Sequence, residues 1–345
     1  MRRLWMIALA GCMIAGCGSP ERRITAAEPL GIPFERDISS FAWLGDGTVI
    51  VSTFPDGLAF WGPGGGIREL QPIVPPDLDC RIVEYSGPVK LSSGAAGVVR
   101  ACSRDTSKVR HNYQVDLVEL DLASGNAQVI VQVAPLVRGM KYGTPQDDYS
   151  VDDVKWSSEH QSAFITIGDA ICPTIAELKP DGVHLLDVAV GSGKDYWRFG
   201  GDPDPATCER EGRATAAAVS PGGGRVAFFG SGSSAGVGGP GRIGAPGALY
   251  VTNRKFEDPT PVVAGVTYVQ SLVWLDEDRL AVSAETVDGA EGPGLWLVDT
   301  RTGKSAKLFD HTLDSLAVSP QGDEIAGVDR VKGEQDRLVK FPIPK

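Results

Sequence analysis

The amino-acid sequence predicts an all-β protein folded as a six-bladed β-propeller, in which an N-terminal strand completes the last blade. Three observations favour this fold. A unit of roughly 50 residues recurs six times along the chain. Glycine and proline are abundant, at 43 and 24 residues, and each unit holds short apolar strands separated by polar turns. Long apolar stripes with helical spacing are few, so we expect sheets to form the core.

Each unit begins with an apolar strand, a tight polar turn and a second apolar strand. We expect these strand pairs at 41–44 with 49–51, 89–91 with 98–99, 154–156 with 164–165, 217–219 with 226–229, 272–274 with 280–282, and 316–318 with 325–328. Third strands are expected at 58–60, 117–120, 175–178, 249–251, 295–298 and 338–341. Fourth strands are expected at 67–70, 129–133, 183–186, 262–264 and 306–309.

The sixth unit has no fourth strand of its own, which would leave an open sheet edge. The stretch from Arg23 to Ala27 precedes the first unit and would fill the gap. Both ends of the chain would then hold the ring together. The predicted organisation is a signal peptide at 1–16, a lipidated N-terminus with the closing strand at 17–33, and the propeller at 34–345.

One position of the first strand carries a bulky apolar residue in several units. Trp43, Trp156 and Trp274 occupy this position, with Leu91, Val219 and Val318 in the other units. A large side chain there would wedge between neighbouring blades. We therefore interpret the three tryptophans as packing residues and not as ligand contacts.

Three segments of the chain resemble the TolB-like six-bladed propellers of bacterial envelopes. Residues 218–228 (AVSPGGGRVAF) and 317–326 (AVSPQGDEIA) resemble the S-P-x-G-x-x-I-A pattern of that family, and residues 295–304 (LWLVDTRTGK) resemble its L-W-x-x-D-x-x-x-G-x pattern. The resemblance implies the propeller fold. The separate N-terminal domain of TolB is missing, which puts TolB's own translocation role in doubt, and a fold does not fix a function.

The first sixteen residues have the features of an export signal. Arg2 and Arg3 form a basic start and residues 4–14 an apolar core, which is too short to span a bilayer. Residues 14–17 (IAGC) resemble a lipobox, so Cys17 is predicted to carry lipid and to anchor the protein to the membrane. An alternative lipobox ends at Cys12 but would leave a very short apolar core. An ordinary secretory signal is the other alternative.

Four further cysteines point to an oxidising compartment. Cys80, Cys102, Cys172 and Cys208 are an even number in an exported chain, so we expect disulfides. Pairing of neighbours, Cys80 with Cys102 and Cys172 with Cys208, keeps each bridge local, although four cysteines allow three pairings. Zinc is disfavoured because no two of them have the short spacing of zinc sites.

The charge balance argues against nucleic acid as a partner. The net charge is −11, and the first sixteen residues contain two arginines and no acid, so the exported chain is more acidic still. An acidic surface repels phosphate backbones and anionic headgroups. The expected location is the bacterial cell envelope, with contact to the membrane through the lipid anchor.

The predicted turns are short on one face of the propeller and long on the other. Loops at 134–150, 191–213 and 231–246 all belong to the second face, and long loops are often functional. The loop between the third and fourth units carries Tyr196, Trp197, Arg198 and Phe199, residue types that anchor interfaces. The same loops carry Asp147, Asp148, Asp202 and Asp204, which offer oxygen ligands of the kind that calcium prefers.

Catalytic motifs are weak in this sequence. Residues 232–236 (GSSAG) fit G-x-S-x-G but lie in a glycine-rich loop without the helix that a nucleophile elbow needs. The four histidines are isolated from one another. The leading hypothesis is therefore an envelope-anchored protein that binds or scaffolds an envelope protein through its long-loop face, without a cofactor. A hydrolase or lyase with a site in the propeller funnel is an alternative, as is a small-ligand or calcium-dependent sensor.

Overall fold

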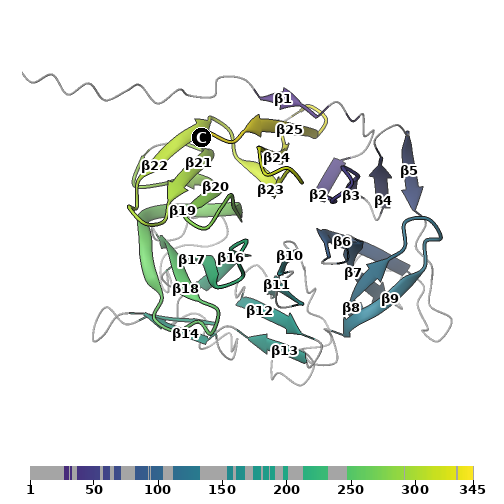
Figure 1. The fold of residues 1–345 in the computed structure, drawn as a ribbon, viewed down its shortest axis with the longest axis horizontal. Helices are drawn as coiled ribbons and strands as arrows, with labels where there is room; N and C mark the ends of the chain where they lie inside the picture. Colours follow the sequence, from purple (N-terminus) through teal and green to yellow (C-terminus); the bar gives the residue numbers. More distant parts are fainter. Residues whose placement is uncertain are drawn as a thin grey trace, which may run out of the picture.

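The chain was analysed as a computed structural model. The structure describes residues 27–30, 32, 37–54, 57–62, 66–70, 82–91, 93, 95–103, 112–132, 154–157, 161–167, 174–179, 182–185, 187–190, 197–200, 213–231, 247–290, 292–331 and 333–344. Every regular element in these ranges is a β-strand. The sheets stand around a common centre in a β-propeller arrangement (Figure 1).

Three four-stranded antiparallel sheets follow one another in the first half of the chain. The first contains β2 (Asp37–Trp43), β3 (Val49–Phe54), β4 (Gly57–Trp61) and β5 (Ile67–Leu70). The second contains β6 (Ile82–Lys90), β7 (Ala96–Ser103), β8 (Asn112–Leu120) and β9 (Ala127–Gln132). The third contains β10 (Val154–Ser157), β11 (Ser162–Ile167), β12 (Thr174–Lys179) and β13 (Gly182–Leu185).

The second half of the chain forms a two-stranded and a seven-stranded sheet. The small sheet pairs β14 (Asp187–Val190) with β15 (Trp197–Gly200). The large sheet contains β16 (Arg213–Val219), β17 (Arg225–Ser231), β18 (Gly247–Asn253), β19 (Thr260–Trp274), β20 (Arg279–Thr286), β21 (Gly294–Asp299) and β22 (Ser305–Phe309).

Strand β19 belongs to both halves of the seven-stranded sheet. Its first residues, up to Val266, pair with β18, and its residues from Thr267 onwards pair with β20. The strand passes the junction at Gly265, whose φ is +66°. A Cβ atom there would lie 2.8 Å from the backbone nitrogen of Gly289, so only glycine fits without displacing the neighbouring turn.

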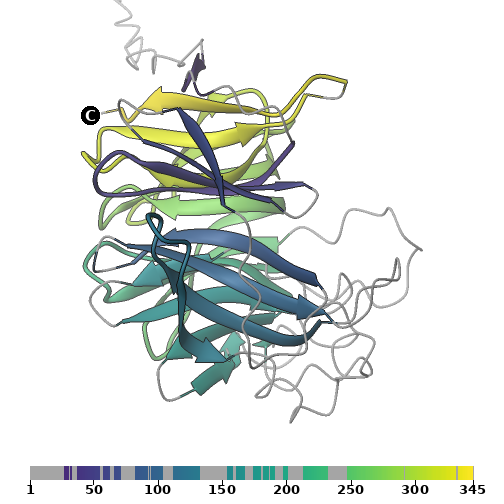
Figure 2. The same ribbon diagram turned by 90° about the vertical axis from the view of Figure 1, so that its right-hand side faces the viewer.

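The last sheet is completed by the N-terminal part of the chain. Its order is β1 (Glu28–Pro29), β25 (Arg337–Pro342), β24 (Glu324–Asp329) and β23 (Leu313–Val318). Glu28 pairs with Lys340, and the amide of Leu30 donates to the carbonyl of Leu338 at 2.9 Å. Figure 2 shows β1, in purple, above the yellow strands of this sheet. An N-terminal strand completes this sheet, but the strand is Glu28–Pro29 and lies just after the predicted stretch 23–27, of which residues 23–26 lie outside the described residues.

Most of the innermost strands carry a bulge that frees backbone amides. Pairing shifts by one residue in β2, β6, β16, β19 and β23. Serine hydroxyls of a neighbouring strand accept these amides: Ser315 from Phe41 at 3.1 Å, and Ser271 from Leu316 at 3.0 Å. Lys155 of β10 donates to the Leu316 carbonyl of β23 at 3.0 Å, which joins opposite sides of the ring in Figure 1.

The tryptophans lie between sheets, as the sequence predicts. Trp274 is 3% exposed, and its indole nitrogen donates to the carbonyl of Ala218 at 3.0 Å. Trp43 packs against a core that includes Val328 of β24. The alignment of the second unit was wrong by one residue. Lys90, opposite Ala96, holds the place that Trp43 holds opposite Val49, while Leu91 is the first residue of the turn.

Candidate functional site

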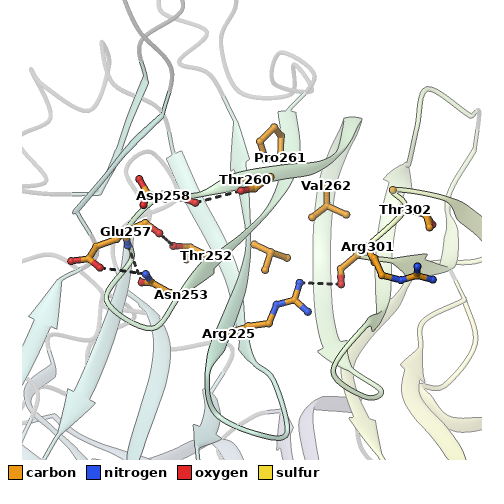
Figure 3. Close-up of a pocket in the computed structure, with 13 residues that line it drawn as sticks. Arg225, Thr252, Asn253, Glu257, Asp258, Thr260, Pro261, Val262, Arg301 and Thr302 are labelled. Carbon is orange, nitrogen blue, oxygen red and sulfur yellow. Dashed lines mark hydrogen bonds between the residues drawn. The ribbon is translucent and has the colours of Figure 1, made fainter.

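A groove of about 550 Å³ lies on the seven-stranded sheet. It lies where four short connections meet: β16–β17, β18–β19, β19–β20 and β21–β22. Consecutive antiparallel connections alternate between the two ends of the strands, and the two halves of β19, which meet at Gly265, count as two strands, so these four connections share one face. The groove is lined by Arg225, Val251, Thr252, Asn253, Glu257, Asp258, Thr260, Pro261, Val262, Thr300, Arg301, Thr302 and Gly303 (Figure 3).

One end of the groove is the loop between β18 and β19, which Asn253 organises. Its side-chain oxygen accepts the amides of Lys255 at 2.9 Å and Glu257 at 3.1 Å. The hydroxyl of Thr252 donates to the carbonyl of Glu257 at 2.7 Å. Side chains of this kind replace the backbone bonds that a tight loop lacks. The loop therefore holds the exposed carboxylates of Glu257 and Asp258 at this end of the groove.

An aromatic contact fixes the same loop to the neighbouring sheet. Phe256 has a φ of +60°, a left-handed conformation that is uncommon for a bulky residue. Its ring packs edge-on against buried Phe164 of β11, with 5.8 Å between the ring centres. Such a strained backbone persists only where its surroundings hold it, and this packing supplies that support.

The other end of the groove is the turn between β21 and β22. The carboxylate of Asp299 accepts the amides of Arg301 at 3.0 Å and Thr302 at 2.8 Å, and the Thr302 amide is the main cause of its lowered pKa. A Cβ atom on Gly303, whose φ is +70°, would lie 2.7 Å from the carbonyl oxygen of Val262. The turn is therefore packed directly on β19.

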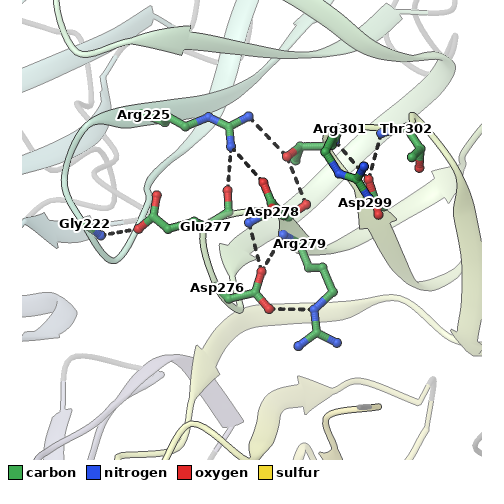
Figure 4. A network of polar contacts seen from close by, with 10 residues as sticks. Gly222, Arg225, Asp276, Glu277, Asp278, Arg279, Asp299, Arg301 and Thr302 are labelled. Atoms are coloured by element: carbon green, nitrogen blue, oxygen red, sulfur yellow. Dashed lines mark hydrogen bonds and ion pairs between the residues drawn. The ribbon is translucent and has the colours of Figure 1, made fainter.

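The floor of the groove is built around Arg225. Its guanidinium donates to the carbonyl of Glu277 at 2.5 Å and to the hydroxyl of Thr300 at 3.2 Å. It also lies 5.0 Å from the ring centre of Trp274, a favourable cation–π arrangement. Asp278 lies 3.6 Å from it, but this pair is largely exposed and adds little. Figure 4 shows the network around this side chain.

Further bonds connect the turns beneath the groove. The amide of Gly222 donates to the carboxylate of Glu277 at 2.5 Å, which ties the β16–β17 turn to the β19–β20 turn. Thr300 donates its amide to the carbonyl of Asp278 at 2.7 Å. The β19–β20 turn is therefore bonded both to the β16–β17 turn and to the β21–β22 turn, which fixes the floor of the groove and one of its ends.

The two ends of the groove differ in charge. Glu257 and Asp258 lie at the end formed by the β18–β19 loop, and Arg301 at the end formed by the β21–β22 turn (Figure 3). Among the described residues, no ion pair or side-chain hydrogen bond engages the exposed Arg301 guanidinium, although its charge contributes to the lowered pKa of Asp299 in the same turn. Threonine hydroxyls and the apolar Pro261 and Val262 lie between the charged ends. The groove is thus dipolar, with an apolar wall.

The sequence placed the site on the long-loop face, whereas this groove lies on the face with the short turns. Most of the predicted site residues lie outside the described residues: Cys17, Cys80, Cys172, Cys208, Tyr196, Asp147, Asp148, Asp202 and Asp204. Cys102 lies in β7 opposite Val83. The disulfides, the lipid site and the calcium site stay predictions. In the described part of the chain, no three His, Cys, Asp or Glu residues are grouped as for a metal.

The structure corrects the placement of the aromatic motif. Trp197, Arg198 and Phe199 were expected in a loop, but they form strand β15, in which Phe199 pairs with Val188. Aromatic residues favour strands, and the preceding stretch Asp187–Val190 supplies the partner. The motif's role in binding stays a prediction.

No helix in the described ranges is long and apolar enough to cross a membrane.

Comparisons with known proteins bear on the fold alone. No protein-family model matches the chain, and no curated protein matches its sequence. The structure is similar to that of a glucose dehydrogenase at 12% identity, over 92% of this chain and 100% of that chain, with a TM-score of 0.54. A protein named as TolB from Agrobacterium tumefaciens is 12% identical over 90% of this chain and 92% of its own, with a TM-score of 0.52.

An oligogalacturonate lyase from Vibrio parahaemolyticus is similar to the same degree. It is 12% identical over 88% of this chain and 76% of its own, with a TM-score of 0.51. The names of these three proteins include two unrelated enzyme activities and TolB, so the shared property is the architecture. The fold and the groove together define an all-β propeller protein with a dipolar groove across one of its sheets.

Proposed function

We propose that this protein is a lipid-anchored binding propeller of the bacterial cell envelope, which holds an extended segment of a partner protein in its groove. The observation that carries the proposal is the dipolar groove on a bonded floor. Its volume of about 550 Å³ suits a short peptide segment better than a folded surface. A ligand with a basic group at one end and an acidic group at the other would complement it.

The groove also offers the means to hold a peptide backbone. Thr260 and Thr302 are exposed on its walls, and although each hydroxyl already has a partner within the protein, its remaining lone pair can accept from a peptide amide. Thr260–Val262 form the start of the outer strand of their half-sheet, and the β21–β22 turn packs against this strand at Val262, so the two sides of the groove are close together. Because the floor is already ordered, binding does not lose the conformational entropy that a flexible site would lose.

Six blades and the membrane anchor are part of this proposal. If the seven-stranded sheet counts as two four-stranded units that share β19, the ring contains six units. Residues 1–16 are then the signal peptide, 17–33 the anchored tether with the closing strand, and 34–345 the propeller. Lipid on Cys17 would keep the groove close to the membrane surface. The aromatic residues Tyr196–Phe199 would form a second contact for an envelope partner on the opposite face.

A charge-swap experiment tests the groove. The full chain is screened against an array of nine-residue peptides that carry one basic and one acidic residue at varied separation and in both orders. We expect peptides with separated opposite charges to bind. Arg301→Glu and Asp258→Lys should each weaken that binding, and the double variant should select peptides of the opposite order.

The matched control is Lys304→Glu, which reverses an exposed charge beyond Gly303 without lining the groove. It should leave the selected peptides unchanged. If Arg301→Glu, Asp258→Lys and the double variant all select the same peptides as the wild type, the groove is refuted as the binding site. For the anchor, Cys17→Ser should move the chain from the membrane to the soluble fraction, and continued membrane association would refute lipidation at Cys17.

A further inference from the structure

A second group of polar side chains lies at the opposite ends of the strands, on the last sheet. Asp329, at the end of β24, is 2% exposed. One carboxylate oxygen accepts from the guanidinium of Arg337 at 3.1 Å. The other, Oδ1, is buried and has no hydrogen-bond partner, although Nδ1 of His311 lies 3.6 Å away. A buried carboxylate oxygen without a donor is costly, so it favours a donor at this position.

His311 is well placed to be that donor. It lies between β22 and β23, and its ring contacts Phe309 with 5.0 Å between centres. Phe309 in turn packs on buried Phe341 at 4.9 Å, so the imidazole rests on the core of the sheet. The His311 side chain is 56% exposed, which leaves room for the small movement that would bring Nδ1 within hydrogen-bonding distance.

The charged side chains around His311 and Asp329 already form ion pairs with one another. Arg330 pairs with Asp314 at 2.7 Å and with Asp336 at 3.3 Å. Burial raises the pKa of the Asp314 carboxyl, and the Arg330 guanidinium opposes that shift. Arg337 is 51% exposed, and beyond Asp329 its contact in the described part of the chain is exposed Glu334 at 3.7 Å. Arg337 thus keeps exposed N–H groups beside His311.

We infer that His311 and Arg337 form a binding site for a small anionic ligand that carries a hydroxyl group, with Asp329 as the positioning residue. Asp329 holds the proton of His311 on Nδ1, so the lone pair of Nε2 faces solvent and accepts the ligand hydroxyl. The outer N–H groups of Arg337 bind the carboxylate or phosphate of the same ligand. This site is on the face opposite the groove and is independent of the proposed function.

The histidine tautomer gives the direct test. In the full chain labelled with 15N-histidine, long-range 15N–1H spectra at alkaline pH should show His311 with its proton on Nδ1. His311→Gln assigns the signal. Asp329→Asn should return His311 to the Nε2–H tautomer that free imidazole prefers, while Asp310→Asn, which removes the neighbouring exposed carboxylate, should change nothing. A wild-type His311 in the Nε2–H form would overturn the inference.

The ligand is tested with 3-phosphoglycerate, which carries a hydroxyl, a carboxylate and a phosphate. Saturable changes in the His311 Nε2 signal are expected, and Arg337→Gln should weaken binding by about tenfold or more. Inorganic phosphate, which lacks the hydroxyl on carbon, serves as the comparison and should bind more weakly. No saturable change with 3-phosphoglycerate, or equal binding by Arg337→Gln, would overturn the ligand site even if the tautomer is as expected.

Discussion

Trp274 and Arg225 together connect the two halves of the seven-stranded sheet, and replacing Trp274 by phenylalanine measures that connection. The substitution removes the indole donor and leaves the buried carbonyl of Ala218 without its 3.0 Å hydrogen bond, at a cost of about 1–3 kcal/mol. The smaller ring also leaves a void of roughly 40 Å³, which costs about 1 kcal/mol. We expect Trp274→Phe to lower the free energy of unfolding by about 2–4 kcal/mol.

Trp296 provides a matched control. It is 5% exposed, and in the described part of the chain its indole nitrogen has no hydrogen-bond partner. Trp296→Phe removes a similar volume but no hydrogen bond, so it should cost about 1 kcal/mol. Urea unfolding followed by far-ultraviolet circular dichroism, with fluorescence as the second probe, measures both variants. Equal losses for the two tryptophans would refute the hydrogen-bond assignment.

A double-mutant cycle of Arg225→Met with Trp274→Leu, which removes the aromatic ring, then measures the contact between the guanidinium and the indole. The guanidinium lies 5.0 Å from the ring centre and is partly exposed, so the coupling should be about 0.5–1 kcal/mol. Strictly additive losses would show that the two side chains stabilise the sheet independently.

Four other substitutions, one of them a control, test three separate features by their melting temperatures. Gly247→Ala places a Cβ atom 2.4 Å from the Gly230 carbonyl oxygen and should cost about 1–3 kcal/mol, whereas Gly224→Ala meets nothing within 4 Å and should be neutral. Lys155→Met removes the bond to Leu316 across the ring and should cost about 1 kcal/mol; an unchanged melting temperature would show that this bond does not stabilise the ring. The pKa of Asp46 is lowered, chiefly by the Thr48 amide, so its stabilising effect is present above the ordinary carboxyl pKa and lost as pH falls through the folded-state value. Asp46→Asn should therefore be less stable than the wild type near neutral pH and equal to it in strong acid; a difference that persists in acid would contradict this.

The strand pattern could be predicted because each unit repeats the same local signals. Turns such as 220–224 and 319–323 are recognised by their Ser-Pro pair and glycine, and the apolar residues on either side alternate as strands require. A missing partner for β25 predicted that the N-terminal region would complete the last sheet, although the strand lies at Glu28–Pro29 and not at 23–27. The shared strand β19 could not be predicted. Its passage from one half-sheet to the next depends on the close approach of Gly265 to the backbone of Gly289, and these two residues are far apart in the sequence.

The groove could not be predicted for a similar reason. Loop length pointed to the other face, while the groove arises where two short turns of adjacent half-sheets come together. The sequence shows Asp299 and Gly303 as typical turn residues, and it shows Arg225 as a basic residue that follows a run of glycines. Their convergence depends on contacts across the sheet, such as that between Arg225 and Thr300. His311 and Asp329 likewise meet only because β24 ends beside the β22–β23 connection.

The closure of the ring by its two ends is the central structural claim, and hydrogen exchange at β25 tests it directly. Alternate amides of β25 point towards β24 and towards β1. The account predicts that both sets exchange slowly in the full chain. Replacing residues 27–32 by a glycine–serine stretch should speed exchange on the β1 side only. Fast exchange on that side in the unaltered chain would contradict a ring closed by β1.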